Sequence, residues 1–342
     1  MAPTLVPSPE SPPSTIYSET ESAMSGITIQ SDDLPGYFVM RHGRQQPAND
    51  SIVKWFPFDN IRRHALWYYI IRSLFGGDYV GPFGDIVIPN DGRQRQVLEL
   101  GTKAGTWVQA MATQFPHVQF RSVDVVPVVP HVPRRNIIFE VYDFTAGILL
   151  EDESQDVVFL NMILEVVKDY RTLIHEVQRV IRPGGMIQIR DYSSNLWDSE
   201  DITVPAQHRN PQGYRLSNFV RRHLSTLGID PDTCEKVPQW LSPSSDVWDR
   251  GQKGFKDIQS VFRAYPAFPH EGLPCADHID IKILPYLRHL TEVSMRDTCG
   301  LLQDSGLEEK EVRTLIDDAI EELKRHESCA MFKFYCIYGI KI

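Results

Sequence analysis

The fold is decided by one stretch, Val97-Leu98-Glu99-Leu100-Gly101-Thr102-Lys103-Ala104-Gly105-Thr106-Trp107. It predicts a short apolar strand that ends in a glycine turn, followed by a helix from about Trp107 to Gln114. Glycines at the end of a strand let a ligand approach the backbone closely, because no Cβ stands in the way. The N-terminus of the following helix offers free N–H groups and a positive dipole end, which suit a carboxylate. Glu99 stands where it can attract an α-ammonium group, so the turn favours an amino-acid ligand over a pyrophosphate.

Strands and helices continue to alternate up to residue 191. A helix is expected after the fourth strand, because Leu173, Ile174, Val177 and Ile181 form one apolar stripe. Such alternation predicts an α/β fold with a parallel sheet and helices on both of its faces. The further strands are expected at residues 118–123, 137–141, 156–160 and 186–190.

Acidic residues follow the second and third of these strands. Asp124 ends the second strand, where a carboxylate can accept both hydroxyls of a ribose. Asp143 follows the third strand, and Phe144 beside it offers an apolar face, so the pair suits an adenine ring. Asp143 alone would also fit a plain turn residue, and a lone glycine turn is weak evidence. Together, and in this order, these features favour a ligand that carries a nucleoside.

The same residues resemble those of the class I S-adenosylmethionine-dependent methyltransferases, and more narrowly the fungal LaeA-like group. The likeness covers about residues 50–342 and is densest between residues 97 and 191. Its motifs are Leu100-Gly101-Thr102 with Trp107, Asp124 followed by Pro127, Val132-Pro133 before Asn136, Phe139-Glu140-Val141 with Asp143-Phe144, and Arg182-Pro183-Gly184-Gly185.

The resemblance implies a Rossmann-like, seven-stranded methyltransferase sheet whose last strand runs antiparallel. It also implies helical N-terminal and C-terminal additions that form a cap. The cofactor would be S-adenosyl-L-methionine, and no metal is expected. The cofactor contacts carried over from the family are Glu99, Gly101, Gly105, Asp124, Val125, Asp143, Phe144 and Asn161.

The chain departs from the family pattern in three places. Lys103 replaces the middle glycine of the turn, Glu99 replaces the usual aspartate, and Tyr68-Tyr69 replaces a pair of histidines. A lysine that points inward would put a positive charge near a sulfonium cation, whereas an outward side chain would be harmless. These departures leave open whether the chain retains catalysis.

A catalytic base is not identified by any motif. Methyl transfer mainly requires donor and acceptor to be aligned, and it needs a base only if the acceptor carries a proton of high pKa. The two weak candidates are Tyr192, just past the fifth strand, and His64, in the N-terminal helix. Ordinary packing is the simpler explanation for His64.

Composition excludes several other classes of protein. The formal net charge of −10 argues against a nucleic-acid partner, and basic doublets such as Arg62-Arg63 are expected to be solvated. No signal peptide and no apolar run of about 18 residues is visible, so no membrane association is expected. Five cysteines without a Cys-x-x-Cys pair support no zinc ribbon. We expect a cytoplasmic protein, with the nucleus as the alternative.

The chain is expected to hold four segments. Within the last, residues 238–274 are predicted to be irregular with helical pieces, and Ser305 to Glu308 resembles a capping box before a final helix. The segments are a disordered leader at 1–35, an N-terminal helical segment at 36–95 with a helix over 56–75, the cofactor-binding core at 96–197, and a helical substrate cap with a closing helix and strand at 198–342.

The leading hypothesis is a methyltransferase that acts on a small-molecule acceptor, in fungal secondary metabolism. The second is a non-catalytic or regulatory protein of the LaeA type, with a homodimer or a regulatory protein as partner. A nicotinamide oxidoreductase is disfavoured, because Gly101-x-x-x-Gly105 lacks the dinucleotide spacing.

Overall fold

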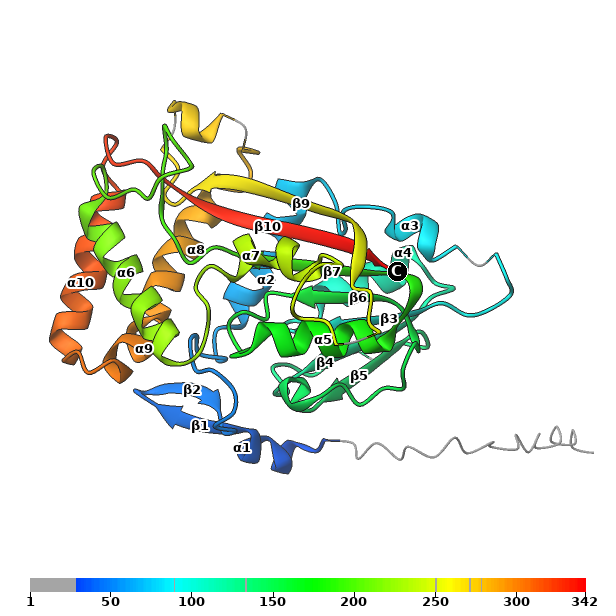
Figure 1. Ribbon diagram of the computed structural model, residues 1–342. Coiled ribbons are helices and arrows are strands. Elements are labelled where there is room, and N and C mark those ends of the chain that lie inside the picture. The colour runs from blue at the N-terminus through cyan, green and yellow to red at the C-terminus, as the bar shows by residue number, and fades with distance from the viewer. Residues whose placement is uncertain (1–28, 89, 133, 250, 271, 278) are drawn as a thin grey trace, which may run out of the picture.

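The computed structural model describes residues 29–342 except 89, 133, 250, 271 and 278 (Figure 1). Its main sheet has the order β5-β4-β3-β6-β7-β10-β8, and β9 pairs with β10. The first five strands along this order are parallel, whereas β10 runs antiparallel to β7 and to β9. These strands are β3 Gln96–Leu100, β4 Gln119–Asp124, β5 Ile137–Val141, β6 Gln155–Asn161, β7 Ile181–Tyr192, the two-residue β8 Trp197–Asp198, β9 Phe255–Pro266 and β10 Ala330–Lys341. The α/β class and the antiparallel last strand are therefore confirmed, but the described sheet has eight strands and not the seven expected, because β9 is added at its edge.

Helices cover both faces of this sheet. On one face α4, Thr106–Gln114, buries Trp107, Val108 and Met111 against Val97 and Phe120 of the strands. The short α3, Phe83–Ile86, joins the same cluster. On the other face lie α5, Tyr170–Val180, and α7, Thr233–Leu241. Each large apolar side chain buried in this way contributes roughly 1.5–3 kcal/mol.

A group of helices lies beyond the carboxyl ends of the parallel strands (Figure 1). It consists of α6 Pro211–Thr226, α8 Leu284–Asp297, α9 Cys299–Asp304 and α10 Glu309–Leu323. The N-terminal helix α2, Ile61–Phe75, lies between this group and the sheet. It buries Trp67 and Ile70 with Leu287 of α8 and Phe334 of β10.

The N-terminal part of the chain differs from the prediction in two ways. The predicted leader lies outside the described residues up to residue 28, but its boundary at residue 35 is wrong. A short 3-10 helix, Ser31–Asp33, leads into α1, Leu34–Tyr37, where Pro35 fits the first turn. The segment at 36–95 also contains a hairpin of β1, Phe38–Arg41, and β2, Arg44–Pro47. Its turn is His42-Gly43, with both residues at positive φ (49° and 72°).

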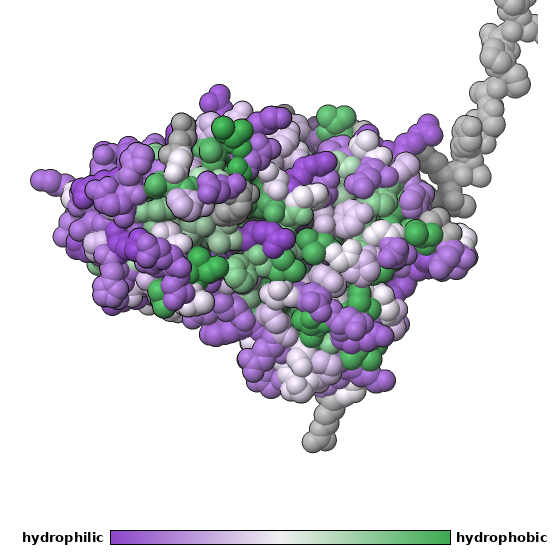
Figure 2. Space-filling model, turned by 90° about the horizontal axis from the view of Figure 1, so that it is seen from above, coloured by the Kyte–Doolittle hydropathy of each residue, from purple (hydrophilic) through white to green (hydrophobic). Residues whose placement is uncertain are grey.

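The C-terminal part contains a strand that the sequence analysis missed. Residues 255–266, predicted to be irregular, form β9 and pair with nearly the whole of β10. As the edge of the sheet, β9 exposes Lys256 and Arg263, charges that discourage pairing with another chain. Figure 2 looks onto this side of the molecule, where hydrophilic and hydrophobic side chains are interspersed. The capping box of α10 is Glu308 with Glu311, one turn later than predicted.

None of the helices in the described part of the chain is long and apolar enough to cross a membrane.

Candidate cofactor and acceptor site

The turn after β3 requires glycine at its first position. Gly101 has φ 94°, and a Cβ there would lie 2.3 Å from the carbonyl oxygen of Asn161. Gly105 has φ 70°, and a Cβ there would lie 2.7 Å from Nδ1 of His131. Both positions therefore combine a left-handed backbone with close packing, which only glycine accommodates without strain.

Glu99 lies beside this turn with a buried carboxyl group. The hydroxyl of Ser122 and the amide of Asn161 donate to its two oxygens, the latter at 2.7 Å. Burial raises the pKa of Glu99 to about 8, so the group is mostly protonated at neutral pH. The guanidinium of Arg190 is also buried, and it donates to the carbonyl oxygen of Asp78 at 2.8 Å. An α-ammonium group bound beside Glu99 would favour its ionised form.

A hollow of about 440 Å³ opens in front of Glu99. It lies at the carboxyl ends of β3 and β6, where ligands of open α/β sheets bind. Its walls are His64, Trp67, Tyr68 and Ile71 of α2, Glu99, Gly101, Thr102, Lys103, Ala104, Thr106 and Trp107 of the turn and α4, and Asn161, Met162 and Arg190.

Lys103 points inward from the turn, but its charge is compensated. Its backbone is left-handed (φ 51°), and its N–H donates to Asp124 at 2.7 Å. Its ammonium group lies 3.3 Å from a carboxylate oxygen of Glu165, whose other oxygen lies 3.2 Å from Arg63. Burial by itself would raise the pKa of Glu165, but Lys103 and Arg63 outweigh it and hold that pKa below its usual value. The side chain of Lys103 therefore points inward, and its positive charge is paired with the carboxylate of Glu165.

The two acids predicted for the nucleoside lie at the ends of adjacent strands. Asp124 is 3% exposed and accepts the backbone N–H groups of Lys103 and Val125 at 2.7 and 2.8 Å. One oxygen of Asp143 accepts the N–H of Thr145 at 3.0 Å, which fixes the 3-10 turn of residues 144–146. Phe144 in that turn is fully buried.

The second oxygen of Asp143 is already engaged by the N-terminal segment. It accepts hydrogen bonds from the amide of Asn49 at 2.9 Å and from the hydroxyl of Ser51 at 2.5 Å. Ile52, next along the chain, belongs to the same buried cluster as Phe144. The hollow in front of Glu99 thus offers suitable groups for the amino-acid end of the expected cofactor. The N-terminal segment, by contrast, covers the residues expected to contact the nucleoside end of that cofactor.

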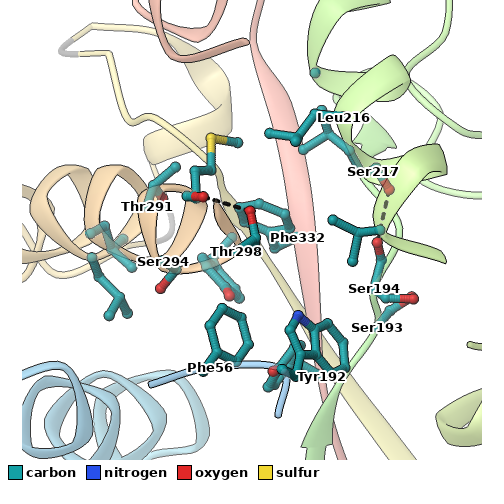
Figure 3. A pocket seen from close by; sticks show the side chains of 18 of the residues that line it. Phe56, Tyr192, Ser193, Ser194, Leu216, Ser217, Thr291, Ser294, Thr298 and Phe332 are labelled. Atoms are coloured by element: carbon teal, nitrogen blue, oxygen red, sulfur yellow. Dashed lines mark hydrogen bonds between the residues drawn. The ribbon is translucent and has the colours of Figure 1, made fainter. Parts of the chain in front are cut away.

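A larger hollow of about 840 Å³ lies beyond α2, between α6, α8 and the end of β7 (Figure 3). Trp67 lines both hollows. Tyr192, which lines the larger one, stacks on Trp67 with ring centroids 5.8 Å apart and an angle of 4° between the planes. The two hollows therefore share an aromatic wall.

The two weak candidates for catalysis lie on different sides of this wall. His64 lines the smaller hollow, 3.2 Å from the guanidinium of Arg63, and burial holds its pKa well below the usual value. Tyr192 donates its hydroxyl proton to Glu165 at 3.2 Å, and burial raises its pKa well above the usual value. His64 is neutral and Tyr192 protonated at neutral pH, and Tyr192 is the one that faces the larger hollow.

Three buried residues of the site were missed in the sequence. Arg63, predicted to be solvated, is 1% exposed and paired with Glu165, so that prediction is wrong for this residue. A signal was available, since Arg63, Trp67, Ile70 and Ile71 share one face of a helix at the spacing of buried residues. Trp67 belongs to that face, whereas Glu165 has no distinguishing pattern in the sequence.

Residues 79–229 match the methyltransferase-domain family. The secondary metabolism regulator laeA of Coprinopsis cinerea is 26% identical over 272 residues, which cover 78% of this chain and 64% of that protein. The methyltransferase pytC of Aspergillus terreus is 26% identical over 295 residues, 84% of this chain and 83% of that protein. Residues 79–229 are therefore a methyltransferase domain, and the chain is similar to laeA and pytC over most of its length.

Among solved structures, phosphoethanolamine N-methyltransferase 2 of Haemonchus contortus superposes on this chain with a TM-score of 0.42 and 14% identity. The superposition covers 87% of this chain and 62% of that chain.

Proposed function

We propose that the chain transfers a methyl group from S-adenosylmethionine to a small-molecule acceptor in fungal secondary metabolism. The observation that carries the proposal is the pair of hollows that share Trp67, at the carboxyl ends of the parallel strands. In-line transfer needs a donor and an acceptor held side by side, with water kept out of the path. The likeness to a fungal methyltransferase and to a fungal regulator of secondary metabolism supports the same assignment.

The smaller hollow would hold the amino-acid end of the cofactor, whose sulfonium supplies an electrophilic methyl group. Glu99 would attract the ammonium group, and Asn161 keeps the carboxyl of Glu99 in place. The absence of side chains at Gly101 and Gly105 would let the ligand approach the backbone.

The adenosyl end would lie over the ends of β4 and β5. Asp124 would accept the ribose hydroxyls, with Val125 beside it, because each oxygen of Asp124 accepts one backbone N–H and keeps a second lone pair. Asp143 would accept the adenine amino group, with Phe144 behind it. The hydrogen bonds of the N-terminal segment to Asp143 would then be exchanged for those of the nucleoside.

A non-catalytic role of the LaeA type is the second candidate. It is favoured by the engagement of Asp143 by Asn49 and Ser51, which competes with the adenine. A homodimer or a regulatory protein partner belongs with this alternative. The five free cysteines support a reducing compartment, and we propose the cytoplasm, with the nucleus as the alternative.

The experiment uses purified protein and S-adenosylmethionine labelled in its methyl group. The gene is first deleted from the source fungus, so that the unmethylated acceptor accumulates in the deletion strain. An organic extract of that strain is then incubated with the protein and the labelled cofactor. We expect label in the organic phase with the native chain and none with Glu99→Gln. A chain that binds S-adenosylhomocysteine but transfers no label to the extract would overturn the catalytic proposal in favour of the regulatory one.

A further inference from the structure

The larger hollow is built without charge. Six aromatic rings make up much of its wall, and aliphatic and hydroxyl side chains supply the rest. No Asp, Glu, Lys, Arg or His side chain occurs among the described residues that line it. A charged ligand would lose its hydration there without gaining a counter-ion, which is costly. The aromatic members are Trp55, Phe56, Trp67, Tyr192, Tyr265 and Phe332.

Most of the hydroxyl groups in this wall are already used. Ser217 donates to the carbonyl oxygen of Ser194 at 2.8 Å, and Thr298 donates to that of Met295 at 2.6 Å, as the dashed lines in Figure 3 show. Thr291 donates to the carbonyl oxygen of Ala267 in the same way. These groups satisfy the backbone and leave little for a ligand.

Two buried polar atoms of the wall are different. The hydroxyl oxygen of Ser294 and the indole nitrogen of Trp55 each expose less than 1 Å² and have no hydrogen-bond partner among the described residues, so each must turn slightly toward the hollow to meet a ligand. Leaving such a group unpaired costs about 1–3 kcal/mol, so buried polar atoms are normally satisfied. Ser294 comes from α8 and Trp55 from the N-terminal segment, and both line the same hollow.

We propose that the larger hollow binds an uncharged, ring-bearing acceptor that presents an oxygen function to Ser294 and Trp55. The flat aromatic walls suit a ring system, since rings pack edge-to-face or offset against other rings. This inference rests on the proposed function in calling the ligand an acceptor, and it names the acceptor's class. Amino acids, phosphorylated compounds and basic side chains of proteins are excluded as acceptors by their charge.

The test uses three probes that share one ring system. At pH 7, 2-naphthol is neutral, 2-naphthoate is an anion and 2-naphthylmethylamine is a cation. Equilibrium dialysis against the full chain, without cofactor, is expected to show 2-naphthol binding at least about ten times more tightly than either ion. Equal binding of the three, tighter binding of an ion, or no binding of 2-naphthol at about 1 mM would overturn the inference.

Variants test the hydroxyl recognition separately. Ser294→Ala is expected to weaken the binding of 2-naphthol about fivefold, because one hydrogen bond is lost. The affinity for naphthalene, which has no hydroxyl group, should stay unchanged. Ser217→Ala is the matched control, because its hydroxyl already donates to Ser194 and its removal should leave the ratio of the two affinities unchanged. An equal loss for both probes in Ser294→Ala would contradict the assignment of Ser294.

The binding assay contains no methyl donor, so the two proposals fail separately. A chain that binds 2-naphthol selectively but never transfers a methyl group refutes the proposed function and leaves the class of ligand intact. A chain that methylates a charged acceptor and ignores 2-naphthol refutes this inference and leaves methyl transfer intact.

Discussion

Replacing Glu165 by glutamine tests whether the buried charges beneath Tyr192 form one compensated group. Glu165 is 2% exposed and lies within 3.3 Å of Lys103 and 3.2 Å of Arg63. The substitution keeps the shape of the side chain and removes its charge. Arg63 would keep an ion pair with Asp297 at 3.2 Å. Lys103 would lose its partner, because the described residues offer no other carboxylate within 4.0 Å of its ammonium group.

The expected loss of stability follows from the fact that Arg63 keeps a carboxylate partner and Lys103 does not. Removing one partner of a buried ion pair costs about 3–5 kcal/mol, and we expect about 3 kcal/mol because Arg63 remains paired. Lys103→Met should cost only about 1 kcal/mol, since Glu165 keeps Arg63 and the hydroxyl of Tyr192. The double variant should cost about 2 kcal/mol less than the sum of the two single variants.

The assay is urea unfolding at pH 7, followed by tryptophan fluorescence and by far-ultraviolet circular dichroism. The slopes must agree among the variants for the free energies to be compared. Glu309→Gln is the control, since Glu309 pairs with Arg313 on an exposed face of α10 and should change stability little. A cost for Glu165→Gln below about 1 kcal/mol, or strict additivity in the double variant, would refute the reasoning.

Three further outcomes are expected. Ser51→Ala should raise the affinity for S-adenosylhomocysteine about fivefold in calorimetry, because one competing hydrogen bond to Asp143 is lost, and a lower affinity would contradict the proposed exchange. Gly101→Ala should lower the free energy of unfolding in urea by at least about 3 kcal/mol. Gly92→Ala is the control: Gly92 also has a positive φ (74°) but open space around it, so its substitution should cost only about 1 kcal/mol. Equal costs would show that packing at the turn is loose. Stability should fall as pH rises from 5 to 8, because the folded-state pKa of Glu99, about 8, lies above its ordinary value of 4.5 and the folded chain then holds the extra proton. Glu99→Gln should make that slope less steep by up to about 1.4 kcal/mol per pH unit, and an unchanged slope would show that Glu99 is ionised throughout.

The sheet and the acids at its edge follow from the sequence because buried parallel strands are short, continuous apolar runs. Asp124 ends β4 and Asp143 follows β5 after one intervening residue, so their place in the fold is fixed by the ends of the strands. The same rule fails for β9, whose pattern is mixed because an edge strand that pairs on one side tolerates polar residues on both faces.

Details of the site depend on contacts between distant segments and could not be predicted in the same way. The direction of Lys103 is set by Glu165, which lies 62 positions further along the chain. The engagement of Asp143 depends on Ser51, which precedes it by 92 positions. Neither partner is marked by a motif.

The hollow for the acceptor is a similar case. Its walls come from the N-terminal segment, α2, α6, α8 and the ends of β7, β9 and β10. The sequence analysis placed an acceptor pocket beneath a helical cap, but the absence of charge from its lining emerges only when these elements are packed together.

Proton release on cofactor binding tests the central claim most directly. In the free chain about 0.9 of Glu99 is protonated at pH 7, given its pKa of about 8. An α-ammonium group bound beside it should lower that pKa and expel the proton. Calorimetric titration with S-adenosylhomocysteine at pH 7, in two buffers of different ionisation enthalpy, should therefore show release of most of one proton, and Glu99→Gln should abolish the release. Tight binding with no proton release from the native chain would contradict the account, because the ligand's amino group would then lie elsewhere.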